Sequence, residues 1–593
     1  MKYQSRLAVL GVVLAMLFAG AARAGAQVMN LVPSDAMIVL KVNHLKETSD
    51  KMGNLAKEFG LAATVPEAAD PLAAMQKRSG INAGVNNKGE MALAVMMPAE
   101  DGDKPKVLVL VPVSDYKAFI GNFADAKTEG EITTFTTPRM HQPTYAADWN
   151  GYAALSDTQD LLAKKPDGLK VQGAAAAKEM AAKDIVFYAN IKTIAAKVLP
   201  ELKAHRAEAL EKAVADFTKQ PGMEEYAPVF RAFMNQAMNV AQGYLHDAES
   251  ATVGFDFGTD GIAVTAMSEF TAGTYSANLV KGLKGAGTDL AGLPDVKYFA
   301  FGGMSVDPKT FTQAFNDFMT PISKELANSG PGGKAINDMV ESGKKAIAAT
   351  KSAAFAYAVP AAQGEGYSQQ VVVSQGDAKV IQAVQKEQIK TVGELLTSFA
   401  KEGEKPPMEF VVQPEAKTVG DLKLDGFEMK LHFDPNDPQA QQTQRMLQMI
   451  YGGEGLSGVF GAVNDKVFIS ATGAPPELLA KTIESAKQGG DTLSAKKHVQ
   501  GVSDKLPKDR ILVEYVALDN IANTALDFAK QQQIPLDVKI PENLPPLGFS
   551  IGCEGNALRG DVFLPTETVK DLISAGLTVY GQMQRGQQGG GGL

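Results

Sequence analysis

Two distant stretches of this chain repeat one pattern of glycine and apolar residues. Residues 254–263 have the sequence GFDFGTDGIA and residues 548–557 have GFSIGCEGNA, so Gly, Phe, Gly, Gly and Ala fall at the same offsets. The correspondence continues without a gap to Gly282-Leu283 and Gly576-Leu577. Because glycine readily adopts the positive φ of tight turns, its spacing predicts strand, turn, strand and helix in both copies. We therefore expect a duplicated scaffold.

Other short segments recur in the same order along the chain. Leu293-Pro-Asp295 corresponds to Val32-Pro-Ser-Asp35, and the predicted strand 509–516 corresponds to 184–191. A chain of 593 residues also exceeds the size of one hydrophobic core. We predict a signal peptide at 1–26, a first half at 27–290, a second half at 291–583 and a disordered tail of Gly and Gln at 584–593.

Short hairpins dominate the predicted strands. Residues 90–97 and 106–113 are two strands joined by a turn-rich segment, and Asn150-Gly151 is the strongest hairpin signal in the chain. Strands paired through hairpins form antiparallel sheets. The expected fold class is therefore α+β, with mostly antiparallel sheets and amphipathic helices packed on one face. Two arrangements of the halves stay open, either end to end or with their sheets joined.

Two predicted helices carry apolar residues at helical spacing, which indicates faces that pack on a core. In the first half these residues are Phe230, Phe233, Met234, Ala237, Ala241, Tyr244 and Leu245, and in the second they are Phe311, Phe315, Phe318, Met319, Ile322 and Leu326. Asp307 is expected to cap the second of these helices, and Asp115 to cap a short helix near 116–123.

The N-terminus has the three parts of a secretory signal. Lys2 and Arg6 precede an apolar run at 7–18, and Ala22-Arg-Ala24 is a small-residue cleavage site, with a second possible site after Ala26. No later stretch approaches the roughly 20 apolar residues of a membrane span. We expect an exported protein of the periplasm, the cell envelope or the extracellular space, without a transmembrane span after cleavage. A retained N-terminal anchor is the alternative.

Charge and cysteine content narrow the classes of function. The formal net charge of -9 argues against nucleic acid as a partner, because a phosphate-binding face needs an excess of Lys and Arg. An apolar share of 45% and a charged share of 21% are those of a globular protein. Cys553 is the single cysteine, which rules out an intramolecular disulfide. Its counterpart in the first repeat is Thr259, so we interpret Cys553 as a small turn residue.

No metal or cofactor site is predicted. The six histidines are scattered, at His44, His141, His205, His246, His432 and His498, and no His-Glu-x-x-His or cysteine pair accompanies them. The glycine-rich segment 329–335 resembles a phosphate-binding P-loop only in composition. Asn328 stands where the first glycine belongs, and Ala335 replaces the hydroxyl that would bind magnesium.

No catalytic residue is predicted either. The segments 342–345 and 494–497 both match Ser-x-x-Lys, the serine pattern of penicillin-interacting enzymes. The further motifs of those enzymes do not follow either serine, and no Gly-x-Ser-x-Gly elbow is present. In a lysine-rich helical chain Ser-x-x-Lys arises by chance. We therefore predict a protein without enzymatic activity.

Methionine is the one unusual apolar component. The chain has 23 methionines, several of them on predicted helix faces at Met234, Met238, Met319, Met446 and Met449. Methionine side chains adapt to varied partners, so such faces suit an apolar ligand. The alternative is that they fill the core beneath the sheets.

The layout resembles a class of uncharacterised exported bacterial proteins that carry a domain of unknown function. The matching residues are Leu31 to Asp35, Leu293 to Asp295, Asn150-Gly151, Ser156-Asp157 and Leu161-Leu162. The resemblance implies repeated strand–helix–hairpin units and export. It implies no catalytic residues.

These observations favour an exported, non-enzymatic binding or structural protein of the bacterial periplasm or cell envelope. Its expected partner is an envelope protein or an apolar small molecule. A carrier of lipid or another apolar ligand, held between a curved sheet and methionine-lined helices, is the first alternative. A hydrolase that acts on the envelope is the second.

Overall fold

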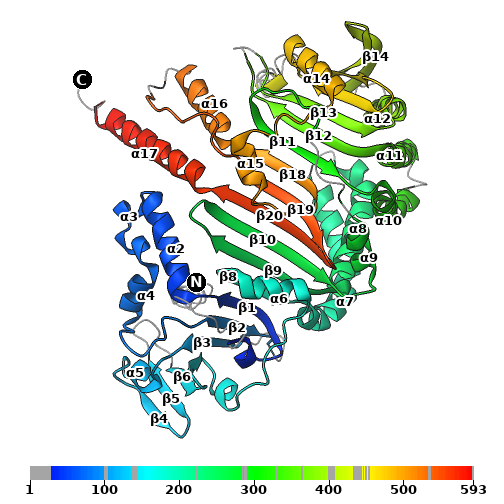
Figure 1. Cartoon of the computed structure of the whole chain (residues 1–593). Helices are drawn as coiled ribbons and strands as arrows, with labels where there is room; N and C mark the ends of the chain where they lie inside the picture. Colours follow the sequence, from blue (N-terminus) through cyan, green and yellow to red (C-terminus); the bar gives the residue numbers. More distant parts are fainter. Residues whose placement is uncertain are drawn as a thin grey trace. The chain divides into compact units, whose positions relative to one another are not determined.

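The computed structural model of the chain is an α+β fold whose strands all pair antiparallel, which confirms the predicted fold class (Figure 1). It describes residues 28–98, 104–136, 143–220, 223–283, 285, 290–326, 330–361, 365–398, 408–431, 442, 444, 447, 450–451, 455–531, 534 and 536–589. The predicted signal peptide at 1–26 lies outside the described residues. Contacts divide the chain into unit 1 (Met1–Pro200, Leu245–Ala277 and Glu554–Leu593) and unit 2 (Glu201–Tyr244 and Asn278–Cys553).

The sheet of unit 1 contains eleven strands. They are β1 (Ala36–Val42), β2 (Met91–Met96), β3 (Val107–Pro112), β4 (Lys127–Glu129), β5 (Ile132–Thr136), β6 (Pro143–Asp148), β7 (Tyr152–Ser156), β8 (Ile185–Asn190), β9 (Ala248–Phe257), β10 (Gly261–Phe270) and β20 (Ala557–Pro565). Neighbouring strands follow the order β20-β10-β9-β8-β1-β2-β3-β7-β6-β5-β4. The C-terminal strand β20 is thus part of the first unit.

The sheet of unit 2 contains the remaining strands. They are β11 (Tyr298–Ser305), β12 (Thr350–Ala358), β13 (Gln369–Gly376), β14 (Met408–Val419), β15 (Leu422–Leu431), β16 (Ser457–Ala462), β17 (Val467–Thr472), β18 (Arg510–Val516) and β19 (Leu547–Glu554). Their order is β19-β18-β11-β12-β13-β17-β16-β15-β14. Nine strands of unit 1, from β9 to β4, follow the same order of pairing.

Helices connect some of these strands, and turns or loops connect the others. The described α-helices are α2 (Leu45–Glu58), α3 (Leu61–Thr64), α4 (Pro71–Ser79), α5 (Tyr116–Ile120), α6 (Ala174–Ala182), α7 (Ile191–Thr218), α8 (Ala227–Asp247), α9 (Tyr275–Gly282), α10 (Pro308–Leu326), α11 (Gly330–Ala349), α12 (Ala378–Ser398), α14 (Pro476–Gln488), α15 (Lys497–Ser503), α16 (Leu518–Gln531) and α17 (Thr566–Gly589). Short 3₁₀ segments are η1 (Val28–Leu31), η2 (Pro66–Ala69), η3 (Gln159–Leu162) and η4 (Glu224–Tyr226).

Local sequence signals account for several of these boundaries. Asp115 caps α5 by accepting a hydrogen bond from the Ala118 N–H at 3.0 Å, and Asp307 accepts from the Thr310 N–H at 2.7 Å before α10. Asn150 and Gly151 have φ of 53° and 89° at the turn between β6 and β7. Both caps and this hairpin turn are as predicted. By contrast, α17 continues through Gly589, into the segment 584–593 for which a disordered tail is predicted.

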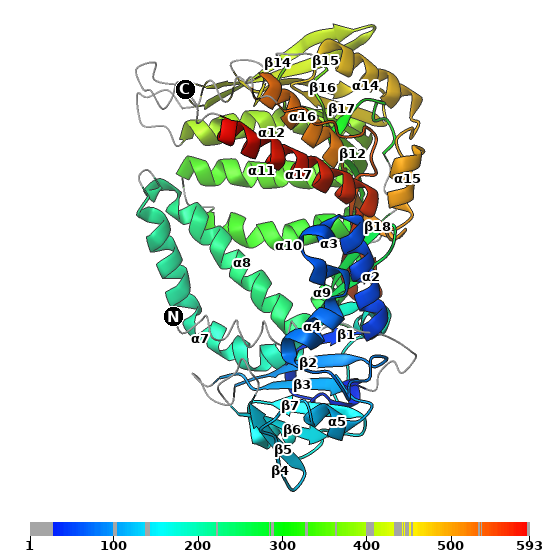
Figure 2. The ribbon, with the colours of Figure 1, turned by 90° about the vertical axis from the view of Figure 1, so that its left-hand side faces the viewer.

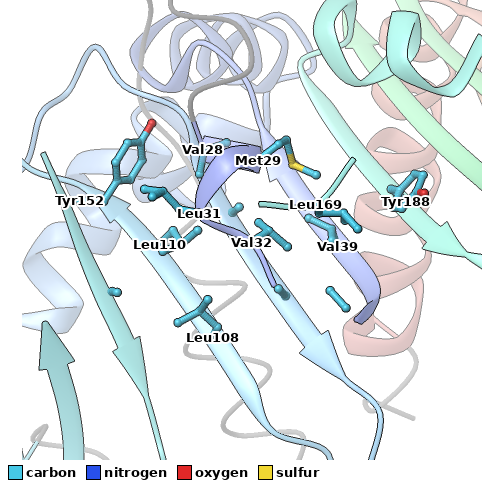
Figure 3. Close-up of a cluster of buried hydrophobic side chains, with 14 of the residues drawn as sticks. Val28, Met29, Leu31, Val32, Val39, Leu108, Leu110, Tyr152, Leu169 and Tyr188 are labelled. Atoms are coloured by element: carbon cyan, nitrogen blue, oxygen red, sulfur yellow. The ribbon is translucent and has the colours of Figure 1, made fainter. Parts of the chain in front are cut away.

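The core of unit 1 occupies both faces of its sheet near β1. On one face, Val28, Met29 and Leu31 of η1 and the following Val32 pack with buried residues of β1, β3, β7 and β8 (Figure 3). On the other face, α2, α4 and α5 contribute to a second cluster that includes Phe119, whose side chain is fully buried. The Phe119 ring meets Phe123 edge to face, with centroids 5.8 Å apart.

In unit 2, helices α10, α11 and α12 lie side by side (Figure 2). Ile322 and Leu326 of α10 pack with Ala232 of α8 and with Ile336 and Val340 of α11. Met319 packs against this cluster, in line with the core-filling interpretation of the methionines. Met446 and Met449 lie outside the described residues.

The predicted buried face of α8 is wrong. Phe233 is 38% exposed, and Ala237 and Ala241 are also exposed, whereas Ala232 and Gln236 are buried. The reason is a polar contact with α10, in which the Gln236 amide donates to the Asp317 carbonyl at 3.3 Å. The apolar spacing correctly predicted a helix, but long-range polar contacts decided which of its faces is covered.

Candidate functional site

One face of five strands in the unit 1 sheet is almost wholly apolar and is only partly covered, since its Leu40 and Val42 belong to the core cluster beneath α2, α4 and α5. Cross-strand pairing of β1, β8, β9, β10 and β20 places its residues in neighbouring rows. We call this surface the apolar face, and its residues are Ile38, Leu40, Val42, Ile185, Phe187, Ala189, Ala251, Val253, Phe255, Phe257, Ile262, Val264, Ala266, Ser268, Leu558, Gly560, Val562 and Leu564. Only Leu40 and Val42 of this set are buried. The others are half-buried or exposed.

Four large side chains of the apolar face are exposed to solvent. Ile38, Phe187, Val253 and Leu558 are 41%, 39%, 36% and 37% exposed, and they come from four different strands. The Phe187 and Phe255 rings meet edge to face, with centroids 6.2 Å apart. Contiguous exposed apolar surface of this kind is uncommon on a soluble protein and marks interaction sites.

The opposite face of the same strands is buried and carries both polar and apolar side chains, the apolar ones including Val39, Val186, Tyr188, Met267 and Phe563. Ser250, Thr252, Thr265 and Asp561 are at most 6% exposed and alternate along their strands with residues of the apolar face. A sheet with one face in water normally turns its polar residues outward. Here the face with the polar residues lies beneath α6, and the apolar face is partly exposed although α2 and α17 contact its strands β9, β10 and β20.

A buried ionic cluster joins α6 to β20 on this buried face. The Arg559 guanidinium donates to both oxygens of Asp561 at 2.8 Å, and it contacts Glu554 at 2.9 Å and Glu179 of α6 at 3.4 Å. Thr265 of β10 donates to Asp561 at 2.8 Å. Burial by itself would lower the pKa of Arg559, but the hydrogen bond and charge of Asp561 outweigh it and raise that pKa. Burial raises the pKa of Glu179, against the charges of Lys183 and Arg559.

Glu269 of β10 holds the other end of α6. Its carboxylate accepts hydrogen bonds from the N–H groups of Ala174, Ala175 and Ala176 at 2.9 to 3.0 Å. These are unpaired donors of the first helical turn, where a negative charge is favourable. A Cβ on Gly173, whose φ is 89°, would lie 2.1 Å from Glu269 Oε2. The sequence contains no local signal for this contact, because Glu269 is far from α6 along the chain.

A buried lysine completes the attachment of α6. Lys41 of β1 pairs with Glu90 at 3.2 Å and donates to the Met180 carbonyl of α6 at 3.2 Å. Burial lowers the pKa of Lys41, while the charge of Glu90 opposes that shift. Asn43 donates to the same carbonyl at 2.8 Å. Because three strands supply its polar partners, α6 is fixed on the buried face, and the apolar face is left partly exposed.

Unit 2 has an apolar pocket where β11 starts and β18 ends. Its volume is about 330 Å³, and it is lined by Phe299, Ala300, Tyr357, Tyr367, Ser368, Ile450, Val516 and Ile521. No charged side chain is among these residues. Tyr357 and Ile521 are exposed, and the Tyr357 hydroxyl accepts from the Gln370 amide at 3.2 Å. The pocket therefore suits an uncharged apolar group.

A second pocket of unit 2, of about 240 Å³, is polar. His498, Asp295, Lys496, Asp519 and Asn543 are among its lining residues. Lys496 pairs with Asp295, and Asp519 accepts from the Leu544 N–H at 3.2 Å. Burial lowers the pKa of His498, assisted by the charge of Lys496. Lys297 also lines this pocket and pairs with Glu542 at 2.9 Å.

The two Ser-x-x-Lys serines donate hydrogen bonds from their hydroxyls to nearby acceptors. The buried Ser342 hydroxyl donates to the Met339 carbonyl at 3.0 Å, and the Ser494 hydroxyl donates to Asp491 at 2.6 Å. Lys345 contacts Glu387 at 3.6 Å instead of Ser342. Both hydroxyls are therefore engaged in local hydrogen bonds. Lys334 of the glycine-rich segment lies within α11.

The remaining single residues have local partners. Burial raises the pKa of the Cys553 thiol to about 11, and its Sγ lies 3.6 Å from the Leu283 carbonyl. His205 is exposed beside Glu208, and His246 contacts Asp247 at 2.8 Å. His141 and His432 lie outside the described residues. Over the described ranges, no group of three or more His, Cys, Asp or Glu side chains is arranged to hold a metal ion.

Within the segments that the structure describes, no helix combines the length and the apolar content needed to cross a bilayer.

Comparisons with known proteins add little. No protein-family model matches the chain, and no curated protein matches it. Among solved structures, crystal form III of TP0453 is similar, with 9% sequence identity, 49% of this chain and 98% of that chain covered, and a TM-score of 0.20. Crystal forms I and IV of TP0453 have the same coverage, 10% identity and a TM-score of 0.19. At these TM-scores the likeness supports no inference about function.

Proposed function

We propose that the chain is an exported, non-enzymatic binding protein of the bacterial periplasm or cell envelope, and that its partner is apolar. The observation that carries this proposal is the partly exposed apolar face of unit 1. The buried face behind it is occupied by α6, which is held by Glu269, Arg559 and Lys41. The apolar side chains therefore cannot turn inward without breaking this buried polar network.

The size of the apolar face sets the energy available for binding. Five strands spaced about 4.8 Å apart and four rows of side chains spaced about 6.8 Å apart cover roughly 20 by 20 Å. Covering about 400 Å² of apolar surface is worth roughly 10 kcal/mol, before the costs of association are subtracted. A partner that covers this face would therefore stabilise the folded chain.

Two further parts of the proposal rest on the sequence. The signal peptide at 1–26 supports export, and subcellular fractionation of cells that produce the full chain tests it. The paired segments around Gly254 and Gly548 support a duplicated scaffold. The common strand order of β1 to β9 and β11 to β19 is what duplication would produce.

Native mass spectrometry tests the binding function. The mature chain, residues 27–593, is purified from a periplasmic extract without detergent, and the same chain unfolded, extracted with organic solvent and refolded is the control. Added mass that the solvent removes is the expected result. A complex with an envelope protein would also support binding. A bare monomer that takes up no apolar compound on incubation would refute the proposal.

A further inference from the structure

We propose that the apolar face of unit 1 binds the acyl chain of a single lipid molecule. This inference rests on the proposed binding function and names its site and its ligand class. Three kinds of partner can cover an apolar surface, namely a lipid molecule, a second copy of this chain and a bilayer surface.

The chemistry of the apolar face favours a hydrocarbon chain. None of its residues is ionisable, and Ser268 is its one polar side chain. A polar or charged ligand that loses water there would find almost no hydrogen bond or counter-ion, which is costly. Methylene groups form no hydrogen bonds with water, so their burial on this face is favourable.

The dimensions fit one acyl chain better than a protein partner. The face is roughly 20 Å long in the strand direction, and an acyl chain that fills one leaflet of a bilayer spans about 15 Å. A stable protein interface buries about 800 Å² on each partner, twice the roughly 400 Å² of this face. The face alone is therefore too small to hold a second copy of the chain.

The exposure of the side chains favours a lipid molecule over a bilayer. Even Ile38, Phe187, Val253 and Leu558, the most exposed large residues of the face, have about three fifths of their surface covered. Helices α2 and α17 contact β9 and β10, and Leu45 of α2 lies in one buried cluster with Leu40 and Val42 of the face. A residue that inserts into a membrane must protrude from the protein surface. These residues are instead recessed between α2 and α17. A recessed surface of this kind suits a single lipid molecule that leaves the bilayer to bind.

A substitution experiment on the mature full-length chain tests the site. The probe is a phosphatidylcholine with one pyrene-labelled acyl chain, transferred from vesicles of unlabelled phosphatidylcholine and followed by its monomer fluorescence. The test variants are Val253→Asn, Phe187→Asn and Leu558→Asn, one on each of three strands. The matched control is Val65→Asn, because Val65 is 49% exposed in unit 1 and lies outside the apolar face.

We expect each test variant to bind the probe about tenfold more weakly than the unsubstituted chain. Each variant loses the contact between one large apolar side chain and the acyl chain of the probe. The control should stay within about twofold. Thermal melting of every variant shows whether it is folded. Because the three test positions lie on different strands, one folded variant is enough for the comparison.

The outcomes separate this inference from the proposed function. Equal probe binding by the test variants and the control would overturn the site while leaving the binding function in place. Loss of vesicle co-sedimentation in the variants, without any soluble lipid complex of the unsubstituted chain, would identify a bilayer surface and overturn the inference. A dimer that dissociates in the variants would identify a second copy and also overturn it. If the unsubstituted chain binds neither the probe nor any native partner, the proposed function itself fails.

Discussion

Replacing Arg559 by leucine should destabilise unit 1 by about 3–5 kcal/mol. The guanidinium is the partner of Asp561 and lies within 3.4 Å of Glu179, and both carboxylates are buried. Removing one partner of a buried ion pair leaves an uncompensated charge, and the cost in measured cases is about 3–5 kcal/mol. The helix α6 should loosen first, since Glu179 is its contact with β20.

The pH dependence gives a second test of the same reasoning. Burial raises the pKa of Glu179 in the folded chain, and losing Arg559 raises it further. A carboxyl whose folded pKa lies above its ordinary value of about 4.3 binds more protons folded than unfolded, so it destabilises the fold as pH rises. The deficit of Arg559→Leu should therefore be largest near neutral pH and shrink as the pH falls toward 5.

Trp149 makes the assay specific to unit 1. It is the single tryptophan of the chain and is 5% exposed, so its fluorescence in urea reports the unfolding of unit 1. Arg78→Leu is the matched control, because Arg78 and Glu67 form an exposed pair at 3.7 Å and such pairs contribute at most about 1 kcal/mol. A loss of less than about 1 kcal/mol for Arg559→Leu, equal to that of the control, would refute the reasoning.

Three more predictions follow from single side chains. Phe119→Ala should cost about 3–5 kcal/mol in urea unfolding, because the fully buried ring leaves a cavity; a cost below about 1 kcal/mol would contradict the packing. Burial by itself would raise the pKa of Asp425, but hydrogen bonds from Lys386 and Gln382 hold this pKa below its ordinary value. The ionised Asp425 therefore stabilises the fold above about pH 4, and this stabilisation is lost as the pH falls through the lowered pKa. Asp425→Asn should thus reduce the fall in the free energy of unfolding that occurs as the pH drops below about 4. An unchanged pH dependence would contradict the pairing of Asp425 with Lys386 and Gln382. The Cys553 thiol, with a pKa of about 11, should react with iodoacetamide at pH 8 far more slowly than free cysteine; mass spectrometry follows the reaction, and an equal rate would show that the thiol is accessible as thiolate.

Short-range signals predicted most hairpins and caps because their chemistry is local. The strands predicted at 90–97 and 106–113 are observed as Met91–Met96 and Val107–Pro112. The turn at Asn150-Gly151 follows from the φ that these residues tolerate. The hairpin of Met408–Val419 and Leu422–Leu431 was not predicted, because its many charged residues hide the alternation and a bulge between Gln413 and Lys417 interrupts its register.

The candidate site depended on information that no local pattern contains. Alternation along β9 separates Val253, Phe255 and Phe257 from Thr252 and Gly254, and this identifies two faces of a strand. It does not say which face is covered. In the structure α6 covers the face of Thr252 and Gly254, while Val253, Phe255 and Phe257 are only partly covered.

The sequence by itself therefore determined the secondary structure class, the antiparallel hairpins and the positions of the helix caps, because these depend on residues a few positions apart. Only the tertiary structure decided that β20 pairs with β10 and that α6 covers the buried face of β9 and β10. The physical reason is that Glu269, Arg559 and Lys41 reach α6 from strands that the sequence keeps far apart. These buried polar contacts commit one face of the sheet to α6 and leave the apolar face partly exposed.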